Sequence, residues 1–207
     1  MSTATAALCI AASYFLGAIP TSYIVARTLG GIDLRDHGSR NLGATNLYRV
    51  LGWKYAVPVG LFDIAKGTVP VVLIAPLGSR STLFAVACGI AAVVGHVFSV
   101  FVRFRGGKGV ATAAGVVLGL TPAALGIAFV VWAGLVWLTG YVSVGSIAGA
   151  LLLPAAVVVL HPGERGLAWV YAGIAAFVVW AHRANIRRLI AGTENRFGRR
   201  ASAGPAS

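Results

Sequence analysis

Long apolar runs alternate with short islands of glycine, asparagine and cations, and this alternation leaves few folds open to the chain. The apolar runs lie at about 4–27, 55–77, 82–102, 110–120, 122–138, 147–160 and 167–181. A helix of ~20 apolar residues crosses a bilayer. Only 11% of the residues are charged, against about 25% in soluble domains. We therefore predict an all-α integral membrane protein with about seven transmembrane helices, formed by one domain over 1–198 and followed by a disordered tail at 199–207.

The apolar stretch 110–138 is too long for one ordinary crossing. Pro122 lies inside it and removes a helix hydrogen bond, so we expect one helix over 110–120 and another over 122–138. The runs 110–120 and 147–160 are short for spanning helices. Five or six crossings with re-entrant pieces are therefore an alternative.

The cations are unevenly distributed. With seven crossings, four islands share one side of the membrane: 27–54, 103–109, 140–146 and 182–207. They hold every lysine and arginine except Lys66, Arg80 and Arg165. The positive-inside rule places that side in the cytoplasm, with the N-terminus outside and the C-terminus inside. These loops and the attraction of cations to anionic lipid account for the net charge of +12, so we expect membrane lipid as a partner and no nucleic acid.

The island 103–109, Arg-Phe-Arg-Gly-Gly-Lys-Gly, carries the strongest functional signal. Glycines at 106, 107 and 109 allow backbone N–H groups to converge on an anion. The Lys108 ammonium and the positive end of the next helix would assist them. The spacing excludes a nucleotide-binding P-loop, because no glycine stands five positions before Gly107 and no serine or threonine follows Lys108. We predict a phosphate or carboxylate site, the alternative being a basic turn whose glycines only allow close helix packing.

The island 33–49 is rich in short hydrogen-bonding side chains. They are those of Ser39, Asn41, Thr45 and Asn46. Arg49 stands four residues after Thr45, on the same face if this piece is helical, and a guanidinium matches phosphate oxygens two at a time. The island is thus suited to a phosphate or glycerol-like ligand, although an N-capped interfacial helix would also explain it.

Ionisable residues occur inside two apolar runs. Asp63 and Lys66 are three residues apart on one helix face, where they can pair. Such groups are costly in a membrane and usually functional, but this pair could also lock helices together. His96 is expected to be a packed, hydrogen-bonding residue.

The last apolar run ends at His182, and Asn185 projects in the same direction three residues later. Snorkelling at a helix end explains Arg183, Arg187 and Arg188, but it does not explain Asn185. The island 140–146 ends at Ser146 and faces the same side of the membrane.

Several other chemistries lack their motifs. No histidine has an acid five residues on, as acyl-CoA-dependent glycerolipid acyltransferases require, and the paired aspartates of CDP-alcohol phosphotransferases are missing. There is no Gly-x-Ser-x-Gly elbow and no His/Cys/acid cluster with metal-ligand spacing. We therefore expect neither a metal nor a cofactor.

The order of the motifs resembles the PlsY family, the bacterial acyl-phosphate:glycerol-3-phosphate acyltransferases. The matching segments are Leu-Gly-Ala-Ile-Pro20, Ser39 to Arg49, Asp63-x-x-Lys66-Gly67, Gly95-His96-x-Phe98, Phe104 to Thr112, Val144-Gly-Ser146 and His182-Arg-x-Asn-Ile-x-Arg188. The resemblance covers roughly residues 8–198.

This resemblance implies an inner-membrane enzyme that moves an acyl group from acyl phosphate to the sn-1 hydroxyl of glycerol 3-phosphate. The products are lysophosphatidic acid and phosphate, and the active site faces the cytoplasm. The catalytic residues implied are Ser39, Arg49, Lys108, His182 and Asn185. Substrate-binding residues would be Asn41, Thr45, Asn46, Gly106, Gly107, Gly109 and Ser146. Supporting residues would be Asp63, Lys66, His96 and Glu194, the last of which is identified by the resemblance alone.

One position departs from the family: many relatives have Ser-Gly-Asn where this chain has Ser39-Arg40-Asn41. The missing nucleophilic triad is consistent with the implied chemistry, because an acyl phosphate is already activated. Positioning and charge stabilisation would then suffice. The general base is open between His182 and a phosphate oxygen of the substrate.

Two other functions fit part of the pattern. A transporter for a small organic phosphate would suit the cationic loops and the Asp63/Lys66 pair, but no inverted repeat is evident. A non-catalytic membrane scaffold would not account for the polar island from Ser39 to Asn46.

Overall fold

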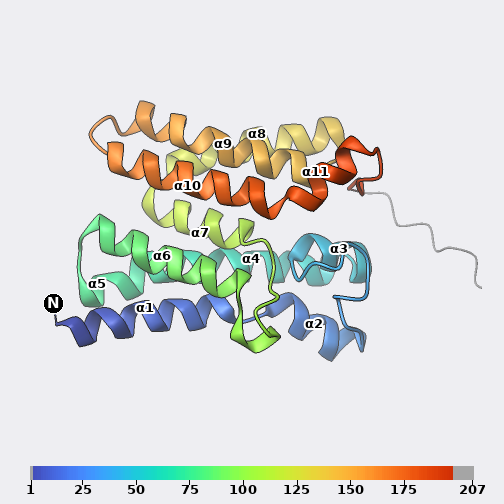
Figure 1. Ribbon diagram of the computed structural model, residues 1–207, viewed down its shortest axis with the longest axis horizontal. Coiled ribbons are helices and arrows are strands. Elements are labelled where there is room, and N and C mark those ends of the chain that lie inside the picture. Colours follow the sequence, from blue (N-terminus) through green and yellow to red (C-terminus); the bar gives the residue numbers. More distant parts are fainter. Residues whose placement is uncertain (1, 198–207) are drawn as a thin grey trace, which may run out of the picture.

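The computed structural model describes residues 2–197. The predicted tail at 199–207 and the domain limit at 198 lie outside this range. Within it, every regular element is helical (Figure 1). The elements are α1 (Thr3–Ala18), α2 (Thr21–Gly30), α3 (Ala44–Leu51), α4 (Trp53–Val69), a π-helical turn η1 (Pro70–Ile74), α5 (Ala75–Gly78), α6 (Thr82–Val97), a 3₁₀ turn η2 (Val100–Val102), α7 (Val110–Leu120), α8 (Pro122–Thr139), α9 (Val142–Leu160), α10 (Arg165–Ala181) and α11 (Arg183–Ile190).

The helices form two groups with α7 between them (Figure 1). In one group α1 packs on α6, and in the other α9 packs on both α8 and α10. The middle helix, α7, contacts α4, α6 and α8. Its approach to α4 depends on two glycines, because a Cβ on Gly67 or Gly115 would overlap the backbone of the facing helix. The glycine-rich loop before α7 therefore leads into a helix that contacts both groups.

Five of the described helical segments are long and apolar enough to cross a membrane, or six if α10 and α11 form one bent span. The 11-residue α7 is apolar but short. All seven predicted runs thus coincide with helices, and the predicted break at Pro122 is confirmed, since α7 ends at Leu120 and α8 begins at Pro122.

The structure differs from the predicted runs and islands in three places. The first run is interrupted between α1 and α2 at Ile19 and Pro20, because proline cannot donate the next helix hydrogen bond. The island 140–146 is largely helical: α9 begins at Val142 and has 19 residues, so the sixth run is not short. The island after 182 contains the short helix α11, which leaves α10 at an angle of 55°.

Candidate active site

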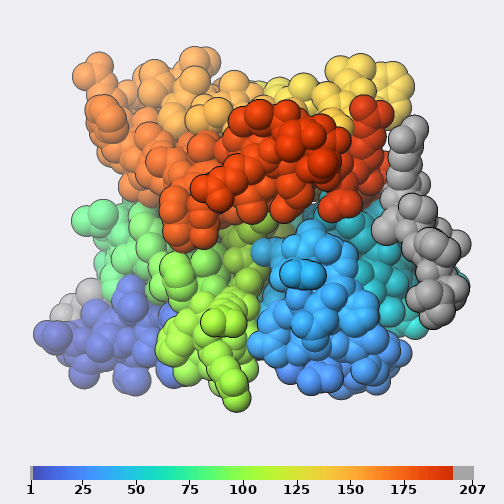
Figure 2. Space-filling view, turned by 45° about the vertical axis from the view of Figure 1, so that its right-hand side comes forward, coloured from blue at the N-terminus to red at the C-terminus, as the bar shows by residue number. Residues whose placement is uncertain are grey.

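A cavity of about 320 Å³ lies where four distant segments meet. They are the loop before α3 with α3 itself, the residues that open α7, the first turns of α9, and the α10–α11 junction with the residues after α11. Figure 2 shows the loop before α7 (light green) beside the loop before α3 (light blue), with the C-terminal helices (orange to red) above them. Most predicted site residues line this cavity: Ser39, Asn41, Thr45, Asn46, Arg49, Asp63, His96, Lys108, Gly109, Ser146, His182, Asn185 and Glu194. Lys66, Gly106 and Gly107 do not.

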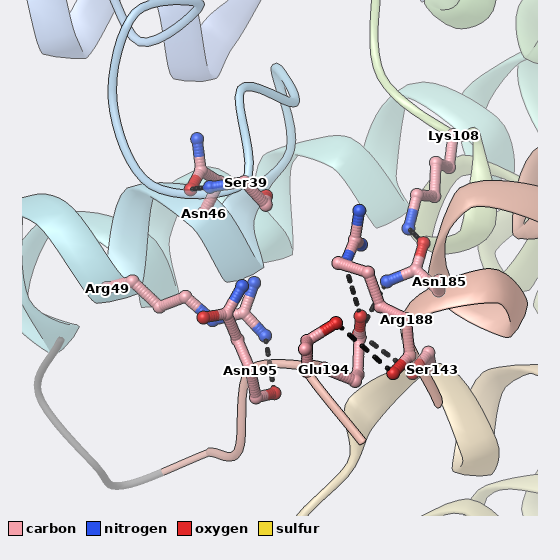
Figure 3. A network of polar contacts seen from close by, with 10 residues as sticks. Ser39, Asn46, Arg49, Lys108, Ser143, Asn185, Arg188, Glu194 and Asn195 are labelled. Atoms are coloured by element: carbon pink, nitrogen blue, oxygen red, sulfur yellow. Dashed lines mark hydrogen bonds and ion pairs between the residues drawn. The ribbon is translucent and has the colours of Figure 1, made fainter. Parts of the chain in front are cut away.

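Lys108 is held at the cavity by a chain of side-chain contacts (Figure 3). Its Nζ donates to Asn185 Oδ1, and Asn185 Nδ2 donates to Glu194 Oε1 at 2.6 Å. Burial lowers the pKa of Lys108 to about 8, although the Glu194 carboxylate opposes this shift. Lys108 is therefore a cation at neutral pH that gives up its proton more readily than an exposed lysine.

Glu194 is the centre of this network and accepts on both carboxylate oxygens (Figure 3). Besides Asn185, it accepts from Ser143 Oγ at 3.1 Å and from Arg188 Nε at 2.6 Å. Sequence reasoning missed Ser143, although it shares a face of α9 with Ser146, three residues on. Arg188 was attributed to snorkelling, but its guanidinium forms an ion pair with Glu194 instead.

Arg49 lies in α3 and faces the other side of the same cavity. One terminal nitrogen donates to the backbone oxygen of Asn195 at 3.3 Å. The buried Nε has no hydrogen-bond partner among the described residues. Burial lowers the pKa of this guanidinium, which nevertheless stays charged. An anion in the cavity would satisfy the unpaired donor.

His182 stands at the bend between α10 and α11. Its Nδ1 lies 2.8 Å from the carbonyl oxygen of Val178. A carbonyl only accepts, so Nδ1 carries the proton and Nε2 of the neutral ring keeps a lone pair. Because His182 lines the cavity, this lone pair is a candidate proton acceptor.

Asn46 was predicted to bind substrate, but its amide is occupied by the loop that it supports. Its Oδ1 accepts from the N–H of Ser39 at 2.8 Å, and Nδ2 lies within 3.3 Å of the carbonyl oxygens of Leu34, His37 and Asn41. Asn46 thus folds the loop and fixes the position of Ser39. Within the loop Arg40 has φ 59°, the left-handed conformation that favours glycine.

The expected anion nest is smaller than the glycine pattern suggests. The N–H of Gly106 donates to Val97 and that of Gly107 to His96, so neither is available to an anion. A Cβ on Gly107 would overlap the ring of His96 and lie 3.0 Å from the backbone oxygen of Leu42. Both glycines therefore serve close packing. Gly109, with φ 76°, caps α7 without a side-chain hydrogen bond, so the first N–H groups of α7 are candidates for binding an anion beside Lys108.

Asp63 and Lys66 form a buried ion pair at 2.8 Å. Lys66 Nζ also donates to the backbone oxygen of Ile19 at 2.9 Å, where the chain breaks between α1 and α2. This contact supports the helix-locking interpretation for Lys66. His96 lies beside the pair, with Nδ1 3.9 Å from Asp63 Oδ1.

The cavity continues as an apolar groove lined by α7, α8, α9 and α10. Its walls include Ala128 and Phe129 from α8, Gly149 and Ala150 from α9, and Val178 from α10. Phe129 is also 60% exposed, so at this wall the groove borders the outer, lipid-facing surface. A molecule with an anionic head and a long apolar tail matches the shape and chemistry of the whole cavity.

Comparison with known proteins agrees with this description. The family model described as "Glycerol-3-phosphate acyltransferase" matches residues 7–192. Glycerol-3-phosphate acyltransferase 1 of Deinococcus radiodurans is 48% identical over 201 residues, with 97% of this chain and 100% of that protein covered. The glycerol-3-phosphate acyltransferase of Chlorobaculum parvum is 42% identical over 224 residues, covering 92% of this chain and 97% of that protein.

Two solved structures are similar as well. The glycerol 3-phosphate form of PlsY, an integral membrane glycerol 3-phosphate acyltransferase, has a TM-score of 0.86 and 37% identity, covering 93% of this chain and 96% of that one. Its lysophosphatidic acid form has a TM-score of 0.84 and 36% identity, covering 93% and 95%.

Proposed function

The chain belongs to the glycerol-3-phosphate acyltransferase family, and on that basis we propose that it transfers a fatty acyl group from acyl phosphate to the sn-1 hydroxyl of glycerol 3-phosphate. The hydroxyl oxygen bonds to the acyl carbon, and the bond from that carbon to the phosphate oxygen breaks. Lysophosphatidic acid and inorganic phosphate leave. One observation carries the proposal: a cavity with Lys108 and Arg49 at its polar end continues into an apolar groove.

Lys108 and Arg49 each hold the phosphate of one substrate. Lys108, with Gly109 and the first N–H groups of α7, holds the phosphate of the acyl donor, whose tail lies in the groove. Arg49 holds the phosphate of glycerol 3-phosphate, because its guanidinium is buried and has an unpaired donor. Ser39, Asn41, Thr45 and Ser146 line the space between them and supply hydroxyl and amide contacts.

Catalysis then consists of positioning the hydroxyl and neutralising the charge that builds on the leaving phosphate. The proton of the attacking hydroxyl passes to His182 Nε2 or to a phosphate oxygen of the substrate. His182→Gln separates these routes. A loss of kcat far larger than the rise in KM for glycerol 3-phosphate indicates a base, whereas parallel losses indicate binding.

We further propose that the protein resides in the inner membrane with seven crossings, the N-terminus outside, and the active site on the cytoplasmic face. All four islands predicted to lie on the cytoplasmic side contribute residues to the cavity, which supports their placement on the same side of the membrane. Single cysteines introduced at positions 42 and 186 test the orientation. Labelling of either position by an impermeant reagent from the periplasm would reverse it.

Purified protein in detergent, supplied with palmitoyl phosphate and radiolabelled glycerol 3-phosphate, tests the reaction. An acyltransferase forms lysophosphatidic acid without a membrane gradient, which a transporter or scaffold does not. Lys108→Met is the critical variant, because it removes the charge from the donor-phosphate site. A folded Lys108→Met protein with parental activity would overturn the proposal.

A further inference from the structure

The groove ends at a definite depth on the surface of α9. The residues of α9 that line it recur at helical spacing, and those in the middle are small: Gly145, Ser146, Gly149 and Ala150. Small side chains leave room for an apolar chain along about two turns. The next lining residue of α9 is Leu153, and it is the first large aliphatic side chain in the groove after these small residues.

The neighbouring helices close the groove at their own large residues. On α8 the deepest lining residue is Leu125, and on α10 it is Ile174. Both pack against the same buried cluster that contains Leu153, together with Val117 and Val157. The three side chains therefore form a floor on top of a packed core.

This core is also fixed by a polar contact. Tyr171 is fully buried in the same cluster, and its hydroxyl lies 2.7 Å from Thr121 Oγ1, so each satisfies the other. A buried, mutually satisfied pair resists displacement, because separating the two groups would leave both unpaired away from water. The packed core therefore keeps the floor residues in place against a flexible acyl tail.

The length of the groove follows from helix geometry. Ser143, at the polar end, and Leu153 are ten positions apart on α9, which corresponds to about 15 Å at 1.5 Å per residue. Carbon–carbon bonds of ~1.5 Å in a zigzag advance about 1.25 Å per methylene. A straight tail of roughly a dozen methylenes therefore reaches from Ser143 to the floor.

We propose that Leu153, with Leu125 and Ile174, sets the acyl-chain length that this enzyme accepts. The inference rests on the proposed function, since it requires acyl phosphate as the donor. These residues do not touch the reacting atoms. They determine specificity because a tail longer than the groove must bend or leave sideways past Phe129.

Variants on α9 test the proposal in both directions. Leu153→Ala removes part of the floor and should move the chain-length optimum about two methylenes longer. Ala150→Leu raises a new floor one turn nearer the polar end and should move it about three to four methylenes shorter. Leu151→Ala is the matched control, because Leu151 is 56% exposed and does not line the cavity.

The measurement is kcat/KM for acyl phosphates of increasing length, at saturating glycerol 3-phosphate, with each purified full-length variant. Opposite shifts in Leu153→Ala and Ala150→Leu, with the parental optimum in Leu151→Ala, support the floor. An unchanged optimum in both groove variants would refute it and show that the tail leaves sideways. Failure of the parent to use any acyl phosphate would instead reject the proposed function.

Discussion

The substitution Glu194→Gln tests whether the network around Lys108 serves catalysis. Glu194 accepts from Ser143 and Asn185 on one oxygen and from Arg188 on the other. Glutamine has nearly the same shape but presents one oxygen and one NH₂ group. Whichever way the amide turns, its NH₂ faces a donor, so at least one of these hydrogen bonds is lost.

The size of the effect follows from the kind of bond. A hydrogen bond to a charged group contributes about 1.5–3 kcal/mol. If that loss appears fully as misplacement of Asn185 and Lys108, kcat/KM falls by roughly 10- to 150-fold, since about 1.4 kcal/mol corresponds to a factor of ten.

The pH dependence separates an electrostatic role from a purely structural one. In the proposed mechanism Lys108 binds phosphate as a cation, and burial lowers its pKa to about 8. In the parent, kcat/KM should therefore decline as pH rises through about 8, where Lys108 loses its proton. Glu194 raises the pKa of Lys108 against this burial. Without the carboxylate the pKa falls further, and the decline should begin at lower pH.

The assay is the formation of lysophosphatidic acid from acyl phosphate between pH 6 and 9.5, with subsaturating acyl phosphate and detergent-purified protein. Glu164→Gln is the matched control, because Glu164 is exposed in the turn before α10, and it should retain the parental profile. If Glu194→Gln loses activity but keeps the parental alkaline limb, the proposed coupling between Glu194 and Lys108 is wrong.

Three further substitutions test the supporting structure. Arg40→Gly should raise the thermal midpoint by about 2–4 °C, because it relieves roughly 1 kcal/mol of left-handed strain; an unchanged or lower midpoint would contradict this. Gly107→Ala should lower the free energy of unfolding by about 1–3 kcal/mol, because its Cβ would overlap the His96 ring, and it should also lower the acylation rate. Gly126→Ala, with open space at its Cβ, should change neither quantity. Lys66→Met should cost about 3–5 kcal/mol by leaving Asp63 buried and unpaired, and the double variant Asp63→Asn/Lys66→Met should unfold at a higher temperature than Lys66→Met alone. Equal midpoints for the single and double variants would show that the pairing is unimportant.

Most helix positions could be predicted from the sequence, because a long apolar run in a membrane protein is expected to form a helix. Pro122 predicted a break correctly, since its missing N–H acts locally. The break at Pro20 was missed because the apolar run continues through it. At this break the backbone oxygen of Ile19 accepts from the N–H of Thr21 and also from Lys66, which lies 47 positions away.

The membership of the site was predicted better than the role of each residue. Short polar groups in separate islands suggested a common cavity, and most of them line one. The hydrogen-bond partners of these side chains depend on tertiary contacts, which the spacing of residues in the sequence does not encode. Asn46 has the chemistry of a ligand-binding amide, yet the backbone of its own loop occupies it. The amides of Gly106 and Gly107 are likewise occupied, because the loop folds back on the end of α6.

Residues beyond α11 complete the cavity after the helices that form its walls. Glu194 and the backbone oxygen of Asn195 accept from Asn185 and Arg49, two side chains that line the candidate active site. Glu194 and Asn195 leave the ribosome after every apolar helix of the described chain. A nascent chain can thus have inserted all of these helices and still lack the contacts that order Lys108 and Arg49, so the cavity is completed only once the segment after α11 has been made and has folded back on it.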